Sequence, residues 1–163
     1  VQMTLTTYDE DLCRKIEPNV STTAERFEVL KTLRDAGIPT VVWLSPILPF
    51  INDNEENLVG ILNICIEAKV RGIICFGMGV TLREGNREYF YEQLDRSFPG
   101  VKEKYVHTYG YQYMLDSPHN GYLMQIFHDT CEKHGIMHDN EQIFAYLSAF
   151  EEKENFKQLS LWD

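Results

Sequence analysis

The chain lacks most features of secreted, membrane-spanning or nucleic-acid-coating proteins. Its cysteines, Cys13, Cys65, Cys75 and Cys131, are scattered along 163 residues. Scattered cysteines exclude a disulfide framework and indicate a reducing compartment, so we expect a cytoplasmic protein. No run of about 18 apolar residues is present, and the sequence therefore predicts no membrane span. Basic residues number 15 against 25 acidic ones, and this net charge of −10 argues against a broad non-specific nucleic-acid surface.

Familiar catalytic motifs are also missing. We find no nucleophile–histidine–acid arrangement, no phosphate-binding loop and no suitably spaced pair of carboxylates. Apolar residues make up 44% of the sequence, which is enough for one domain with its own core.

The chain opens directly on an alternating segment that is typical of a β-strand. In a (βα) barrel, Val1, Met3 and Leu5 would face the covering helices. Thr4 and its polar neighbours would then face the barrel lumen, which would hold a polar ligand. An edge strand with one wet face is the alternative interpretation. Because no lead-in precedes this strand, we expect the chain to be the C-terminal piece of a longer protein.

Two further apolar segments follow at the spacing of parallel βα units. We expect strands at 40–47 and 72–79, and helices at about 22–36 and 55–69. This order favours an α/β fold with a parallel sheet and right-handed crossovers. Later segments at 86–98, 101–109, 117–134 and from 139 onward are predicted to be helical.

Four short segments occur in a fixed order within the first 53 residues. They are Thr4-Leu-Thr-Thr7, Lys15-Ile-Glu-Pro18 followed by Ser21, Leu33-Arg-Asp-Ala-Gly-Ile-Pro39, and Val42-Trp-Leu-Ser-Pro-Ile-Leu-Pro-Phe-Ile-Asn-Asp53. In this order and spacing, the chain resembles the C-terminal part of radical S-adenosylmethionine enzymes, similar to the spore photoproduct lyase-like (DNA repair photolyase-type) family. The likeness covers about the first 100 residues and extends more weakly beyond them.

The resemblance implies a fold and an activity for the parent protein. Residues 1–109 would form the C-terminal half of a partial (βα)6 TIM-like barrel, followed by a helical extension at 110–150 and a flexible tail at 151–163. The parent would be a bacterial lyase-type radical enzyme that binds S-adenosylmethionine and a [4Fe–4S] cluster, with DNA as its expected substrate. A half barrel leaves sheet edges open, and open edges pair readily, so we expect the isolated piece to oligomerise.

The resemblance also implies positions for cofactor contacts. Thr4 would hydrogen-bond a polar part of S-adenosylmethionine, and the backbone carbonyl of Ser45, beside Pro46, would contact the adenine or its sugar. Gly77 and Gly79 would let the ligand approach the backbone closely. A bulge or a tight exit from the strand is the alternative reason for these two glycines.

The chain has no Cys-x3-Cys-x2-Cys motif, which such enzymes use to hold the cluster through three thiolates. We therefore expect the cluster ligands upstream of this chain and expect the isolated chain to be inactive. Separately, Cys131, His134 and His138 have a spacing suited to zinc, with His128 nearby. The alternative is that a histidine in the last turn of a helix complements the helix dipole.

The final residues support a second hypothesis, an interaction module. Gln158-Leu-Ser-Leu-Trp162 resembles the short motif with which bacterial DNA polymerases and repair proteins dock on the sliding clamp, although that motif usually ends in Phe. Leu159, Leu161 and Trp162 would be apolar anchors, and Gln158 would set the orientation through hydrogen bonds. The alternative is that Leu161 and Trp162 pack on their own domain.

Overall fold

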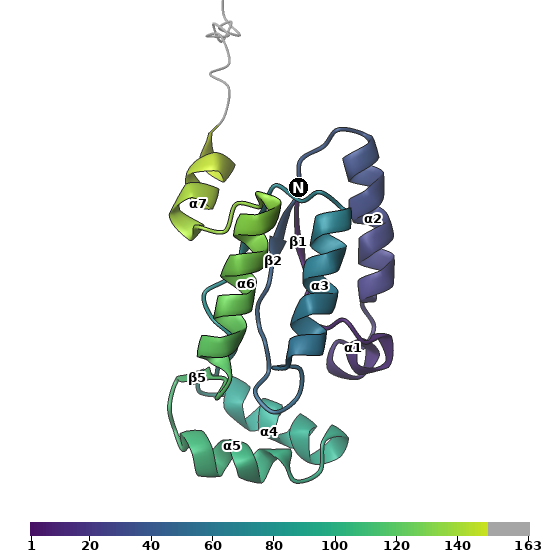
Figure 1. Cartoon of the computed structure of the whole chain (residues 1–163). Coiled ribbons are helices and arrows are strands. Elements are labelled where there is room, and N and C mark those ends of the chain that lie inside the picture. Colours follow the sequence, from purple (N-terminus) through teal and green to yellow (C-terminus); the bar gives the residue numbers. More distant parts are fainter. Residues whose placement is uncertain (150–163) are drawn as a thin grey trace, which may run out of the picture.

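The structure, a computed structural model, describes residues 1–149 and contains a small parallel sheet (Figure 1). Strands β1 (Gln2–Thr4), β2 (Val41–Trp43) and β3 (Gly72–Ile74) are arranged in the order β1-β2-β3. Both neighbouring pairs are parallel. The predicted α/β class with a parallel sheet is thus confirmed. Within the described residues this sheet is open, with β1 and β3 at its edges.

Helices connect and cover these strands. They are α1 (Glu10–Ile16), α2 (Thr23–Asp35), α3 (Glu55–Glu67), α4 (Asn86–Ser97), α5 (Val101–Tyr109), α6 (Asn120–His134) and α7 (Asn140–Ser148). Short polar side chains cap several amino ends by accepting a backbone N–H: Asp9, Thr22, Asn54 and Asp139. Among the helices in residues 1–149, none has the length and apolarity to cross a membrane.

One face of the sheet is covered by α2, α3 and α6, which run along the strands in Figure 1. Leu5, Val42 and Ile73 project into this aliphatic core and are fully buried. From the helices, Ile61 and Phe127 pack against them. We call this the covered face. The alternation predicted for the first strand is confirmed, because Gln2 and Thr4 point the other way and are exposed.

The opposite face is only partly covered. On this face, Ile143 of α7 packs on Val41, the first residue of β2, and on Ile74, the last residue of β3. Further along, Trp43 contacts Phe76 and Phe144, with ring centroids 6.3 and 6.1 Å apart. Phe76 remains 65% exposed. We call this the open face.

The segment at 72–79 differs from its prediction as a single strand. It divides into β3 and a separate strand β4 (Gly79–Thr81), which pairs antiparallel with β5 (Met114–Asp116). Gly77 lies between β3 and β4 with φ +125°, a conformation that favours glycine and redirects the chain between the two strands. The boundary expected near residue 110 falls between these two paired strands.

The β4–β5 pair, α4 and α5 form a second unit at the carboxyl ends of the parallel strands (Figure 1). Its core is rich in aromatic rings, with Tyr105 and Tyr109 buried against Leu82, Leu94 and Leu115. These two tyrosines therefore serve core packing. Tyr111, by contrast, is 95% exposed.

The two sheet edges are not equally open. At the β3 edge, the Ile73 N–H donates to the Met137 carbonyl at 2.8 Å. The Asn140 amide donates to the Cys75 carbonyl at 2.9 Å and accepts from the Cys75 N–H at 3.3 Å. The expectation of open edges is therefore wrong for β3, whose backbone groups are satisfied by residues 137–140. Oligomerisation through the β1 edge stays a prediction.

Candidate functional site

A hollow of about 270 Å³ lies where β2 and β3 end. Ser45, Pro46, Gly77 and Gly79 all line it, and these are four of the five cofactor positions predicted from the sequence. The carboxyl ends of parallel strands are the usual place for ligand sites in α/β proteins. The structure thus brings together residues that lie more than 30 positions apart in the chain. What the hollow binds stays a prediction.

Backbone hydrogen bonds hold the two walls of this hollow together. The Leu44 N–H donates to the Ile74 carbonyl at 2.9 Å, and the Ile47 N–H donates to the Gly79 carbonyl at 3.1 Å. The cis peptide between Ser45 and Pro46 lies between these two contacts. The segment that follows β2 is therefore hydrogen-bonded to the end of β3 and to the start of β4 on both sides of the Ser45–Pro46 peptide.

The glycines of the hollow have structural reasons for being glycine. At Gly79, an added Cβ would lie 2.6 Å from the Leu115 carbonyl oxygen and 3.0 Å from Asp116 Cα. At Gly77 the positive φ disfavours any side chain. These observations support the alternative interpretation, a tight exit from the strand. The presence of glycine at both positions is therefore explained without a ligand close to the backbone, although both residues line the hollow.

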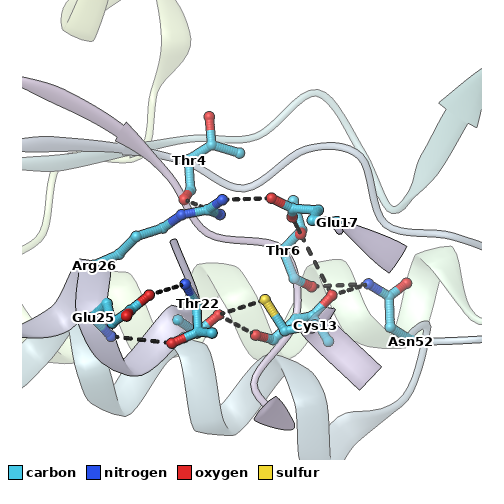
Figure 2. Close-up of polar contacts among 10 residues, drawn as sticks. Thr4, Thr6, Cys13, Glu17, Thr22, Glu25, Arg26 and Asn52 are labelled. Carbon is cyan, nitrogen blue, oxygen red and sulfur yellow. Dashed lines mark hydrogen bonds and ion pairs between the residues drawn. The ribbon is translucent and has the colours of Figure 1, made fainter. Parts of the chain in front are cut away.

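Thr4 lies apart from the hollow, at the β1 edge. Figure 2 shows the Arg26 side chain reaching from α2 to the Thr4 carbonyl, which it contacts at 3.2 Å, and to Glu17. The Arg26–Glu17 ion pair measures 2.5 Å, with side chains 14% and 25% exposed. Thr4 does not line the hollow, and its contact with the cofactor stays a prediction. Thr4 does share the open face with Trp43, its partner in the sheet.

The pKa of Glu17 is set by opposing effects. Burial acts to raise it, but hydrogen bonds from Arg26 and from the Thr6 hydroxyl, together with the positive charge of Arg26, lower it below its usual value. Glu17 is thus a carboxylate held by the fold. Glu17 belongs to the segment Lys15-Ile-Glu-Pro18, which contributes to the family resemblance. At this position the residue has a structural role.

Asn52, in another of those segments, also has a structural role (Figure 2). Its side-chain amide donates to the Thr6 carbonyl at 2.9 Å and to the Thr7 hydroxyl at 3.2 Å. Its oxygen accepts from the Leu48 N–H at 2.6 Å. These bonds anchor the chain that leaves β1 to the loop that follows β2, so they place the two strand ends side by side.

Sequence reasoning missed several residues of the hollow, namely Phe76, Val80, Thr81, Met114 and Asp116. The last two come from β5, in a region that was expected to be helical. Its sequence, Tyr111-Gln-Tyr-Met-Leu-Asp116, is rich in residues that favour strands and could have indicated β5. Asp116 is the acidic side chain that lines the hollow.

Two arginines, Arg83 and Arg87, follow β4. Arg87 donates to the backbone carbonyls of Leu82, Gly110, Tyr111 and Gln112 and so holds the α5–β5 connection in place. Arg83 donates to the Tyr113 hydroxyl at 3.5 Å, and this hydrogen bond lowers the pKa of that exposed tyrosine. The role of Arg87 is therefore structural.

The cysteines do not form a cluster site. All four are buried and free. Burial raises the pKa of the Cys65 and Cys75 thiols, and raises that of Cys131 to about 12, so these three stay protonated at neutral pH. Within residues 1–149, no group of three His, Cys, Asp or Glu side chains could hold a metal ion. The cysteines therefore do not fit an iron–sulfur cluster. The zinc hypothesis for Cys131, His134 and His138 is wrong, because these three side chains do not form a group that could hold a metal ion.

The predicted clamp-docking residues Gln158, Leu159, Leu161 and Trp162 lie outside the described residues. Docking on a bacterial sliding clamp therefore stays a prediction.

The chain is similar to part of several longer proteins. An uncharacterized protein of Mycobacterium tuberculosis and one of Mycobacterium bovis are each 29% identical to it over 109 residues. The match covers 67% of this chain and 32% of each relative, so the chain spans about a third of the length of the curated relatives it matches. No protein-family model matches the chain. No solved structure is significantly similar to it.

Proposed function

We propose that this chain is the C-terminal part of a radical S-adenosylmethionine enzyme and forms one wall of its cofactor pocket. The observation that carries the proposal is the hollow at the ends of β2 and β3, where four residues predicted from the resemblance converge. Its volume of about 270 Å³ is at the small end of ligand pockets, which usually hold about 300–1,000 Å³. A wall of this size suits a pocket that is completed by another part of the protein.

The chemistry of the hollow fits an adenosyl group. Phe76 offers an exposed ring on which a purine can stack. Asp116 can accept hydrogen bonds from sugar hydroxyls, and Ser45 adds a hydroxyl and a backbone carbonyl. When bound beside a reduced [4Fe–4S] cluster, S-adenosylmethionine supplies a radical that removes a hydrogen atom from the substrate. The residues of this chain would orient the adenosyl group and exclude water from it.

The open sheet supports a longer parent. In the proposed half barrel, the open face would line the lumen and a preceding strand would pair with β1. The curated relatives are about three times as long as the matched region, which leaves room for such strands and for the cluster ligands. The proposal includes a lyase acting on DNA, as the resemblance implies, although the charge of −10 means that DNA contacts would come from other parts of the parent.

The test uses the longer protein that contains this chain. After anaerobic reconstitution with iron and sulfide, it receives dithionite and S-adenosylmethionine, and 5′-deoxyadenosine is measured. We expect production in the wild type and a loss of about tenfold or more in Asp116→Asn, because a charged hydrogen bond to the sugar is removed. Asp11→Asn, on the exposed surface of α1, is the matched control and should behave as wild type. No product from protein with an assembled cluster would overturn the proposal.

A further inference from the structure

Two histidines meet where α6 turns into α7. His128 on α6 and His138 in the turn have ring centroids 5.2 Å apart, with ring planes inclined by 59°. The Phe127 ring lies against both, at 5.2 and 6.0 Å between centroids. The sequence had suggested Cys131 and His134 as partners of His138. The fold selects His128 instead, because Cys131 faces the core and is fully buried.

The spacing of the pair matches that of two imidazoles on one metal ion. Zinc binds imidazole nitrogen at about 2.0–2.1 Å in tetrahedral geometry, which puts two ring centroids about 5 Å apart. His128 and His138 already have this separation. The separation of the two rings is therefore compatible with one shared ion.

A second observation concerns the hydrogen bond of His138. Its Nδ1 lies 3.1 Å from the Ile136 carbonyl oxygen, which can only accept. In the neutral ring the proton is therefore on Nδ1, and the lone pair is on Nε2. Metal-binding histidines commonly donate their other N–H to a carbonyl in this way, which fixes both the tautomer and the ring orientation.

Acidic side chains lie on the His138 side of the pair. Glu132, His138 and Asp139 line one hollow of about 470 Å³, together with Arg71. The carboxylate of Asp139 also caps α7 through the Gln142 N–H at 2.8 Å. Since no third protein ligand stands at metal distance within residues 1–149, water would complete the coordination.

We propose that His128 and His138 bind a divalent transition-metal ion that prefers imidazole, such as Zn²⁺, and that this ion clips the start of α7 to α6. The consequence would reach the open face, because α7 carries Ile143 and Phe144, which cover Val41, Ile74 and Trp43. The ion would thus stabilise the position of α7 over the sheet. This proposal does not rest on the radical-enzyme assignment.

The test measures Zn²⁺ binding to the chelator-treated intact protein by competition with a chromophoric chelator. We expect one equivalent in the micromolar range that is weakened at least about tenfold in His128→Gln and in His138→Gln, since each removes one of two ligands. His134→Gln, an exposed histidine on the same helix, is the matched control and should keep that equivalent. Equal binding in all four proteins, or no saturation below about 1 mM, would overturn the proposal.

A second measurement separates metal binding from folding. His138→Gln also removes the hydrogen bond to Ile136, whereas the His128 side chain makes no hydrogen bond in the described part of the chain, so His128→Gln is the cleaner variant. Hydrogen exchange of the amides in 137–148 should slow on addition of Zn²⁺ in the wild type and in His134→Gln, and stay unchanged in His128→Gln. Equal slowing in His128→Gln would contradict the clip.

Discussion

The two faces of the three-stranded sheet differ in what they bury. On the covered face, Leu5, Val42 and Ile73 are wholly enclosed by helices. On the open face, Gln2 and Thr4 remain exposed, and the aromatic rings are only partly covered by α7. Alternate residues of the same short strands therefore enter environments with very different access to water.

This difference teaches where stability and binding reside. Apolar burial contributes about 25 cal/mol per Å², so the covered face supplies most of the stability of the sheet. The open face leads at its carboxyl end to the hollow lined by Ser45, Phe76 and Asp116. A face that contributes little to stability can hold residues selected for binding.

The largest expected effect is on the covered face. Ile73→Ala removes a fully buried side chain from the middle of β3, and we expect the free energy of unfolding to fall by about 2–5 kcal/mol. Urea denaturation followed by circular dichroism measures this change. A loss below about 1 kcal/mol would mean that the core relaxes around the cavity and that the contrast between the faces is weaker than the structure shows.

The next effect concerns the glycine at the hollow. Gly79→Ala places a Cβ 2.6 Å from the Leu115 carbonyl oxygen, so β4 and β5 must separate, and we expect a loss of about 1–3 kcal/mol in the same assay. Gly121→Ala in α6 is the control. Its Cβ would meet no atom within 4 Å, and helix propensity predicts a gain of up to about 1 kcal/mol. Equal stability of the two variants would contradict the packing role of Gly79.

A smaller, pH-dependent effect on the free energy of unfolding is expected at the β1 edge of the sheet. Glu17→Gln weakens the contacts with Arg26 and Thr6, and we expect a loss of about 1–2 kcal/mol at pH 7. The pKa of Glu17 is lowered in the folded state, so its stabilisation is present above the ordinary value of 4.5 and disappears as pH falls through the lowered value.

Urea titrations from pH 7 to pH 3 measure that difference. The gap between wild type and Glu17→Gln should close on acidification. Glu28→Gln, which changes the exposed partner of Lys31 on α2, serves as the control and should show almost no gap at any pH. A gap that persists unchanged at pH 3 would exclude ionisation of Glu17 as its cause.

The smallest effect on stability is expected on the open face. Phe76 is 65% exposed, and we expect Phe76→Ala to change the free energy of unfolding by no more than about 0.5 kcal/mol. If the ring stacks on a purine, the same variant of the intact protein should bind S-adenosylmethionine about tenfold more weakly. Calorimetric titration measures the affinity. Unchanged affinity would remove Phe76 from the proposed pocket while leaving the comparison of the faces intact.

Local patterns predicted most of the helices. The capped starts at Asn54 and Asp139 and the helix at 101–109 agree with the structure because caps and apolar spacing act within a few residues. The segment at 72–79 was harder. Its apolar run is compatible with one long strand, and only the packing of β5 against Gly79 shows why the chain breaks at Gly77.

Part of the candidate site was also predictable. The resemblance implied Ser45, Pro46, Gly77 and Gly79 as cofactor positions, and these four residues do line one hollow. Asp116 and Met114 were not found, because a three-residue strand has too little periodicity to be separated from the helical pattern around it. Thr4 was predicted on the face of β1 opposite the covering helices, and it lies there. That it lies outside the hollow was not predictable from the alternation of β1.

The sequence by itself determined the α/β class, the parallel order of βα units, the alternating faces of the first strand and the free state of the cysteines. These features follow from hydrophobic periodicity, capping and spacing, which are local. Only the tertiary structure decided that residues 137–140 cover the β3 edge, that Arg87 binds backbone carbonyls, and that His138 meets His128. Those outcomes depend on contacts between residues distant in the chain, where backbone groups and side chains take whichever partner the packed helices bring within reach.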